Sequence, residues 1–312
     1  MLTRRHIRVK VMQSVYAFQR ANNDDLKPQE KFLNASMDHM YDLYLIMINL
    51  LLETRALAEV QLEKGQKKYL ATAEEKNPSR KFIENELLTT LSNNSNLIHL
   101  LDDRKLRNWK DDDEYVRIIY DAIVESDLYQ VYLQDEKRSF KGDLNIIIDL
   151  YKQVIAPNDK LYDYLEDKRL TWLDDLPLVN TMVLKTLRKI NQDVDFKLPK
   201  LFKDEDDKKF AIDLFRKTVL NDEALGKEIE GKTPNWDKER IAQLDAVLLR
   251  MAICEFTKFP SIPVKVTINE YLEIAKEYST PKSSVFINGI LDKLVKEYQQ
   301  KGTLNKVGRG LM

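Results

Sequence analysis

The chain has 312 residues, of which 43% are hydrophobic, enough for one large core or two modest ones. Charged residues make up 32%, and glycine and proline contribute only 8 and 9 residues, a mix that favours an all-helical protein. Because 50 Lys and Arg nearly balance 51 Asp and Glu, the chain is not a polycation, and any nucleic-acid site must be a local patch.

The cysteine content and the hydropathy indicate the cellular compartment in which the protein is expected. The single cysteine, Cys254, excludes an internal disulfide framework, fits a reducing compartment, and lies on an apolar helix face as a small buried hydrophobe would. The most apolar run, residues 43–52, has about half of the roughly 20 residues that a membrane span needs. The basic N-terminus leads into an amphipathic helix, which is not a secretory signal. We expect a cytoplasmic protein without a membrane partner.

Residues 3–20 are predicted to form the first helix. Ile7, Val11 and Val15 recur along one face at helical spacing, with Ser14 and Phe18 beside them. Four basic residues cluster at the helix start: Arg4, Arg5, Arg8 and Lys10. Positive charge opposes the macrodipole there, so another interaction should favour it, and phosphate binding is the obvious candidate. The alternative is an ordinary solvated basic helix end.

The middle of the chain is predicted to be helical and internally repeated. A polar connection over 21–30 leads into a long helix over 31–68 and then a polar linker. Tryptophans follow at 109, 172 and 236, separated by 63 and 64 residues. At an offset of 64, ten of the 49 residues in 143–191 are identical to those in 207–255, and a weaker match precedes residue 143. We interpret these stretches as degenerate copies of one helical hairpin. The alternative is that amphipathic helices share apolar spacing.

The turns within these copies are rich in Asn and Asp, and the tryptophans are expected to be packing anchors. Asn and Asp cap helices and tolerate turn geometry, so the turns near 93–97, 156–161 and 220–225 should precede short helices. The acidic runs at 111–114 and 204–207 each precede an apolar helix, where carboxylates cap amides and favour the dipole.

Three helices are predicted in the last seventy residues. Between 240 and 258, Leu244, Val247, Leu248 and Met251 mark one apolar face, together with Ile241. Two prolines within 259–264 end this helix, a second runs from about 267 to 278, and a third follows Pro281.

Catalytic signals are absent from the sequence. The three histidines, at 6, 39 and 99, lie far apart, and there is no HExxH, P-loop, GxGxxG or GxSxG string. The acidic runs lack the calcium-loop pattern and its glycine. We predict no enzyme, no cofactor and no metal site.

Four strings carry a resemblance to a known family. LDAVLLRMAICEF, IPVKVTINEYLEIAKEYS and SSVFINGILDKL resemble the C-terminal half of the bacterial transcription antitermination factor NusB family, and RRHIRVKVMQSVYAFQ resembles its first helix. The resemblance covers roughly residues 3–20 and 207–298, and an ordinary member would be about half as long. It implies an all-α NusB-like helical bundle, here enlarged by inserted hairpins that we interpret as duplicated.

The predicted division follows from this resemblance. It gives a first core helix (1–20), a helical insertion (21–200) with repeats near 80–128 and 143–191, a C-terminal core (201–300) and a mobile tail (301–312). The implied function is to hold single-stranded boxA-like RNA together with the small-subunit ribosomal protein NusE in the transcription elongation complex. That assembly would support ribosomal RNA transcription.

The resemblance also implies two sets of contact residues. The RNA-binding set is Arg4, Arg5, His6, Arg8, Lys10, Tyr16, Lys282 and Phe286. In many members the turn entering the last helix is acidic, whereas here Lys282 replaces a carboxylate, so we expect RNA binding that depends less on a partner. For Tyr16, a place in the core is as compatible with the sequence as contact with RNA. For Phe286, burial in the core is at least as compatible with the sequence as contact with RNA. The protein-partner set is Asp245, Glu255, Lys265 and Glu270, with Asp245 expected on the polar side of its helix.

Two other functions remain open. One is a non-catalytic helical scaffold that binds proteins, in which the arginines only solubilise a helix end. The other is the RNA-binding module of a ribosomal RNA modification or maturation system, since methyltransferases that modify ribosomal RNA can carry a NusB-like domain. The chain has no glycine-rich cofactor loop, so that reading requires catalysis by another chain.

Overall fold

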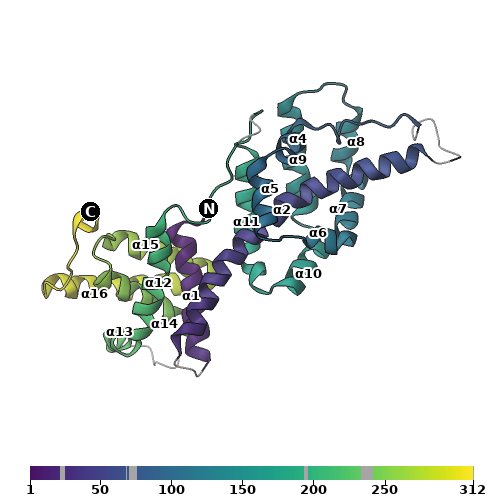
Figure 1. Ribbon diagram of the computed structural model, residues 1–312. Helices are drawn as coiled ribbons and strands as arrows, with labels where there is room; N and C mark the ends of the chain where they lie inside the picture. Colours follow the sequence, from purple (N-terminus) through teal and green to yellow (C-terminus); the bar gives the residue numbers. More distant parts are fainter. Residues whose placement is uncertain (22–24, 68, 70–75, 193–195, 233–241, 312) are drawn as a thin grey trace. The chain divides into compact units, whose positions relative to one another are not determined.

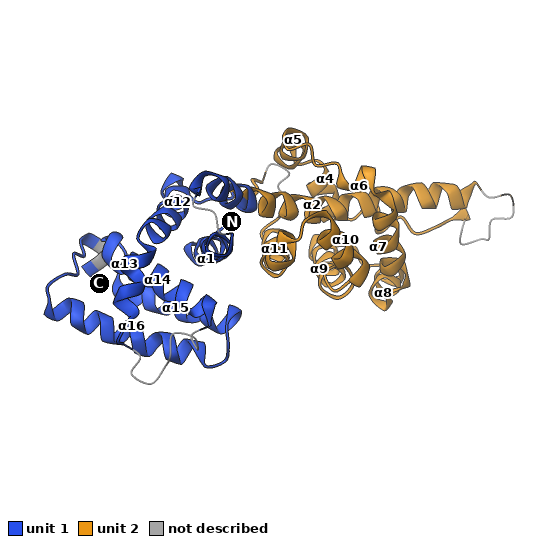
Figure 2. Ribbon diagram, turned by 90° about the horizontal axis from the view of Figure 1, so that it is seen from below, with its two compact units in different colours: residues 1–37, 201–312 blue, residues 38–200 orange. Residues whose placement is uncertain are grey.

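The computed structural model describes residues 1–21, 25–67, 69, 76–192, 196–232 and 242–311. Within these ranges all regular structure is helical, as the composition predicts. The chain divides into two compact units, residues 1–37 with 201–312 (unit 1) and residues 38–200 (unit 2), coloured separately in Figure 2.

In the described part of unit 1 the chain forms seven α-helical segments, labelled in Figure 1, and a short terminal turn. They are α1 (Arg4–Arg20), the start of α2 (Leu26–Gln66), α12 (Glu205–Leu220), α13 (Asp222–Ile229), α14 (Gln243–Lys258), α15 (Val264–Tyr278), α16 (Ser283–Gln300) and the 3-10 turn η3 (Gly308–Leu311). The helices expected over 3–20, 267–278 and after Pro281 are confirmed. At α12, Asp204 accepts a hydrogen bond from the Asp207 amide at 3.0 Å, which confirms the expected acidic cap.

Helix α14 is the centre of unit 1. It contacts α1, α12, α13, α15 and α16, and ten of its residues are buried. Val247, Leu248 and Met251 are fully enclosed, as predicted, but so are Leu249 and Ile253 on other sides of the helix. The single apolar face inferred from spacing is therefore wrong, since α14 is covered almost all round by its neighbours.

Unit 2 is built from the rest of α2 and a series of mostly short helices. They are α4 (Glu86–Ser92), α5 (Ser95–Asp103), α6 (Asn108–Asp111), α7 (Asp113–Glu125), α8 (Asp127–Gln134), α9 (Phe140–Leu150), the π-helical turn η1 (Tyr151–Ile155), α10 (Asp159–Lys168) and α11 (Thr171–Leu187). Asn94 and Asn158 cap α5 and α10 through their side chains, as expected for these turns. Asn221, before α13 in unit 1, makes no such bond.

Two tryptophans anchor the short helices of unit 2 to α2. The indole of Trp109 donates to the carbonyl of Ile46 at 2.7 Å, and that of Trp172 donates to the carbonyl of His39 at 2.8 Å. Both rings are buried, so they are the packing anchors that the sequence predicts. The two acceptors are seven residues apart, about two turns along the same face of α2.

The order of the helices can be set beside the predicted duplication and the predicted division of the chain. Near an offset of 64, α9 with η1, α10 and α11 precede α12, α13 and α14 in the same long, short, long order. Trp236 and Ile241 lie outside the described residues, and the duplication stays a prediction. The first unit boundary falls inside α2 rather than at residue 20. In the tail, the Val307 amide donates to the Pro260 carbonyl at 3.0 Å.

Candidate nucleic-acid interface

Helix α1 begins with a local cap that involves His6. The amide of Thr3 donates to His6 Nδ1 at 3.2 Å, and the Thr3 hydroxyl lies 3.0 Å from the same nitrogen. This bond satisfies a donor just before the first turn, where backbone amides otherwise lack partners. His6 thus has a structural role at the base of the predicted RNA-binding segment.

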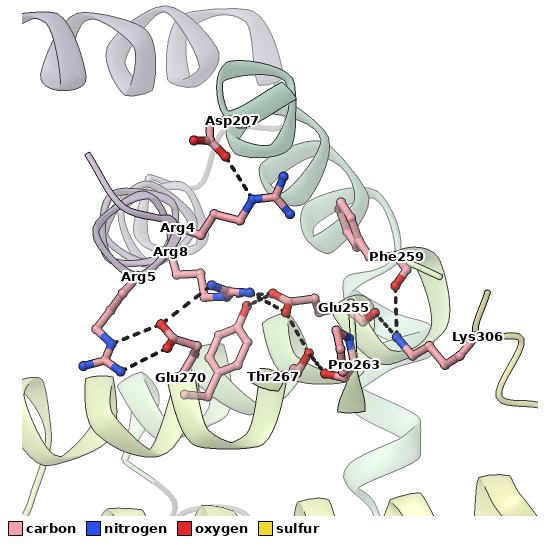
Figure 3. Close-up of polar contacts among 11 residues, drawn as sticks. Arg4, Arg5, Arg8, Asp207, Glu255, Phe259, Pro263, Thr267, Glu270 and Lys306 are labelled. Atoms are coloured by element: carbon pink, nitrogen blue, oxygen red, sulfur yellow. Dashed lines mark hydrogen bonds and ion pairs between the residues drawn. The ribbon is translucent and has the colours of Figure 1, made fainter. Parts of the chain in front are cut away.

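Arg8, which was assigned to RNA binding, is buried in an ion pair with Glu255 of α14, which was assigned to partner binding. Its Nε and Nη2 atoms donate to the two carboxylate oxygens at 2.9 and 2.6 Å, and the two side chains are 2% and 0% exposed (Figure 3). Thr267 and Tyr271 donate their hydroxyls to the same carboxylate at 2.7 and 3.2 Å. Burial is the largest single effect and lowers the pKa of Arg8, but the charge and the hydrogen bond of Glu255, with smaller effects of Tyr271 and Glu270, together outweigh it and raise that pKa. Neither charge is open to a ligand in this conformation.

Arg4 and Arg5 are exposed enough to reach a ligand, but each is also paired within unit 1. Arg4 Nε donates to Asp207 Oδ1 at 2.9 Å, and its guanidinium lies 5.0 Å from the centre of the Phe210 ring. Arg5 donates from Nε and Nη2 to the two oxygens of Glu270, both at 3.0 Å. The Glu270 hydrogen bond is the main cause of a raised pKa for Arg5. Figure 3 shows Arg4 pointing toward Asp207, Arg5 toward Glu270 and Arg8 toward Glu255, with a second, longer contact from Arg8 to Glu270.

A groove of about 1120 Å³ runs along these residues. Its walls come from the starts of α1 and α12 and from the link between α14 and α15, and Arg4, Arg5, Asp207, Phe210 and Glu270 are among its lining residues. The exposed edges of both guanidinium groups are therefore next to open space that an anionic ligand can enter.

The other two α1 residues assigned to RNA differ in exposure. Lys10 is buried, 3% exposed, so its charge does not face solvent. Tyr16 is half-buried, and the Arg20 guanidinium lies 5.5 Å from its ring centre.

The second predicted RNA contact lies at the turn entering α16. Lys282 is exposed and precedes the helix, and Phe286 is half-buried one turn later. A cavity of about 390 Å³ is lined by both, together with Thr280, Pro281 and the start of α14. The turn therefore presents a cation beside an aromatic ring.

Asp245 holds this turn in place. Its two carboxylate oxygens accept hydrogen bonds from the hydroxyls of Ser279 and Ser283 at 2.6 and 2.7 Å. It is 4% exposed, so the expectation that it lies on the polar side of its helix is wrong. Of the four residues assigned to a protein partner, Lys265 is exposed and Glu270 half-buried, while Asp245 and Glu255 are buried.

Some residues of the site were missed from the sequence. Lys306, in the tail that was predicted to be mobile, donates its ammonium to the carbonyls of Glu255 and Phe259 at 3.2 and 3.0 Å, at the end of α14. Cations are favourable at a helix C-terminus, and burial lowers the pKa of Lys306. Asp207 was interpreted only as a helix start, although it is also the acceptor for Arg4. Neither contact has a local sequence signal.

Two features bear on other classes of function. The described residues contain no group of three or more His, Cys, Asp or Glu side chains arranged to hold a metal ion. Among the same residues, none of the helices combines the length and apolarity needed to span a bilayer.

Comparison with known proteins identifies the family. The model of the NusB family matches residues 178–296. This chain is similar to proteins named transcription antitermination protein NusB, and three of these relatives come from the following bacteria. The relative from Salinibacter ruber is 45% identical over 112 residues, which cover 36% of this chain and 70% of the relative. The relative from Chloroherpeton thalassium is 43% identical over 105 residues, 34% of this chain and 50% of its own length. That from Koribacter versatilis is 45% identical over 94 residues, 30% and 64% of the two chains.

No solved structure shows a significant match. The matched family segment ends within α16 and begins within α11, so it contains α12 to α15 and most of unit 1 after residue 201. The identity and the coverage of the Salinibacter protein show that the chain belongs to the NusB family.

Proposed function

We propose that this chain is an RNA-binding transcription antitermination factor that acts with a small-subunit ribosomal protein, NusE, on boxA-type RNA and so supports ribosomal RNA transcription. The observation that carries the proposal is the 45% identity to a protein named for transcription antitermination, joined to two exposed arginines beside an open groove. The action is non-catalytic: cations neutralise phosphates and an aromatic ring contacts bases.

The RNA contacts follow from exposure. Arg4 and Arg5 supply phosphate affinity, and Lys282 with Phe286 supplies a second contact at the turn before α16. Because Lys282 is a cation and not a carboxylate, this turn attracts phosphate without help from a partner. Lys265 and Glu270 of α15 are the exposed or half-exposed charges available to the ribosomal protein.

The distribution of charge supports an RNA site on unit 1. Residues 1–37 and 201–312 contain 26 Lys and Arg against 21 Asp and Glu, whereas residues 38–200 contain 24 against 30. Unit 1 is therefore net positive and unit 2 net negative. A phosphate chain is attracted to the first and repelled by the second.

The test is a salt titration of RNA binding with the full-length chain. An Arg4→Gln, Arg5→Gln double variant is compared with Lys27→Gln, Lys31→Gln, which removes two exposed cations from the same unit at the start of α2. Arg8 is left intact because it is buried against Glu255. Loss of two phosphate contacts should reduce the slope of log affinity against log salt by at most about 1.4 for single-stranded RNA, the value for two arginines without internal partners.

The probes are a short boxA-like RNA and a scrambled RNA, each with and without the ribosomal protein. Selective binding of the boxA-like RNA that only the arginine variant weakens supports the proposal. Equal, weak binding of both RNAs by all three proteins refutes it and favours the protein-binding scaffold.

A further inference from the structure

Arg4 and Arg5, the partly exposed arginines at the start of α1, are each already held by a carboxylate of their own chain. We propose that Asp207 and Glu270 compete with RNA phosphates for Arg4 and Arg5, and so lower the RNA affinity of the free chain. This inference rests on the RNA binding proposed above. Replacing either acidic residue by its amide should therefore raise the affinity for RNA, whereas replacing a residue that contacts RNA lowers it.

The Arg5–Glu270 pair imitates the phosphate contact that would replace it. Two parallel N–H donors of the guanidinium meet two oxygens at 3.0 Å each, the same two-pronged arrangement in which arginine binds phosphate. The side chains are 39% and 21% exposed, so the pair is weakened by water and ions and is open to exchange. A phosphate can bind the two-donor edge formed by Nε and Nη2 only when Glu270 gives up these bonds, and on the remaining Nη1 edge it meets an arginine whose charge Glu270 already compensates.

The Arg4–Asp207 pair is exposed on its arginine side only. One bond of 2.9 Å joins the groups, and the side chains of Arg4 and Asp207 are 43% and 9% exposed. The Phe210 ring supports the guanidinium from 5.0 Å and stays available when the partner changes. Asp207 lies in the first turn of α12, where the helix dipole favours its negative charge. The helix dipole therefore favours the charged form of the group that competes with phosphate.

The third arginine at the start of α1, Arg8, takes no part in this competition. Its partner Glu255 is 0% exposed and also accepts hydrogen bonds from Thr267 and Tyr271, so this pair does not open to RNA. Glu270 lies 3.8 Å from Arg8 but is not its main partner, so removing the Glu270 charge leaves Arg8 paired with Glu255. The Arg4 and Arg5 pairs can thus be altered while the bonds between Arg8 and Glu255 stay in place.

The experiment separates lost competition from a general gain of positive charge. Glu270→Gln is compared with Glu277→Gln, an exposed residue two turns further along α15. Asp207→Asn is compared with Asp206→Asn, its exposed neighbour in the first turn of α12. Each control removes one negative charge from the same helix and, among the described residues, breaks no hydrogen bond or ion pair with an arginine; Glu277 acts on Arg5 only through its charge. Circular dichroism confirms that all four variants remain helical.

Binding of boxA-like single-stranded RNA by the full-length chain is measured at about 50 mM salt. We expect Glu270→Gln and Asp207→Asn to bind about 2- to 5-fold more tightly than their controls, the range that a half-exposed ion pair supports. In an Arg5→Gln background the gain from Glu270→Gln should fall to that of its control, because the competed group is gone.

The outcomes distinguish this inference from the proposed function. If the Arg4→Gln, Arg5→Gln variant loses affinity but Glu270→Gln and Asp207→Asn bind no better than their controls, RNA binding stands and the competition is refuted. A gain from Glu270→Gln that persists in the Arg5→Gln background also refutes it. If the unaltered chain does not select the boxA-like RNA, both proposals fail.

Discussion

Replacing Glu255 by Gln tests the structural assignment of the Arg8 pair. Glutamine keeps the shape and leaves an amide oxygen that can accept from Thr267 or Tyr271, but it removes the charge that faces Arg8. Since the Arg8 side chain is 2% exposed, the guanidinium has no route to water when its partner is neutral. The change therefore leaves a buried, uncompensated cation.

The expected cost is large. Breaking a buried ion pair by removing one partner costs about 3–5 kcal/mol. Glu270, 3.8 Å from Arg8, compensates part of the charge, so we expect the lower end, about 3 kcal/mol, for unit 1. That loss corresponds to roughly a 100-fold rise in the fraction of unit 1 that is open. Glu270→Gln is the matched control: it removes the half-exposed pair with Arg5 and the 3.8 Å contact with Arg8 but leaves Arg8 paired with Glu255, so it should cost only about 1 kcal/mol.

The assay has to report on unit 1 alone. Tryptophan fluorescence would also report on unit 2, where Trp109 and Trp172 lie. Hydrogen exchange is therefore followed instead, by mass spectrometry of peptides from α1, α14 and α15. Glu255→Gln should accelerate exchange in these helices and leave α9 and α11 unchanged. Equal exchange in the Glu255→Gln and Glu270→Gln variants would refute the reasoning, since it would mean that the buried pair contributes no more than the half-exposed one.

Three further predictions concern single groups. Asp245→Ala removes the acceptor of the Ser279 and Ser283 hydroxyls, so α16 amides should exchange faster, with a loss of about 1–3 kcal/mol; unchanged exchange would show that the turn holds without it. Trp172→Phe keeps most of the apolar area but loses the bond to the His39 carbonyl, which should lower the free energy of unfolding of unit 2 by about 1 kcal/mol in urea. Trp109→Phe loses the corresponding bond to the Ile46 carbonyl and should have a similar cost. Burial raises the pKa of Cys254 from 9.0 to about 11, so the folded thiol keeps its proton longer than the unfolded one. Its contribution to stability is complete below pH 9 and is lost as pH rises toward 11, a fall that Cys254→Ala should lack in the same pH series.

Local patterns predicted the helices well. The apolar spacing of Ile7, Val11 and Val15 and the prolines that separate α14, α15 and α16 depend only on neighbours in sequence, and the structure has these elements where they were expected. Asn94 and Asn158 were predicted as turn and cap residues for the same reason. What spacing did not reveal is that α14 is enclosed on nearly all sides, because that depends on which helices surround it.

The roles of charged residues were harder to predict. Arg8 and Glu255 are 247 residues apart, and each resembles an exposed charge on an amphipathic helix when seen alone. Asp245 likewise finds its serine partners 34 and 38 residues later. The unfavourable cluster of cations at the start of α1 did require another interaction, as its conflict with the helix dipole indicated. In the free chain that interaction is with carboxylates of α12, α14 and α15.

The number of cations in unit 1 is therefore a poor measure of its affinity for RNA. Arg8 and Lys10 are buried, and under the competition that we propose Arg4 and Arg5 would exchange one anionic partner for another on binding phosphate. The gain from each exchange is the difference between a phosphate contact and an internal ion pair, and the released carboxylate then repels the RNA backbone. Salt weakens the internal pair and the phosphate contact together. The affinity that Arg4 and Arg5 add should consequently be smaller, and less sensitive to salt, than that of two unpaired arginines in the same place.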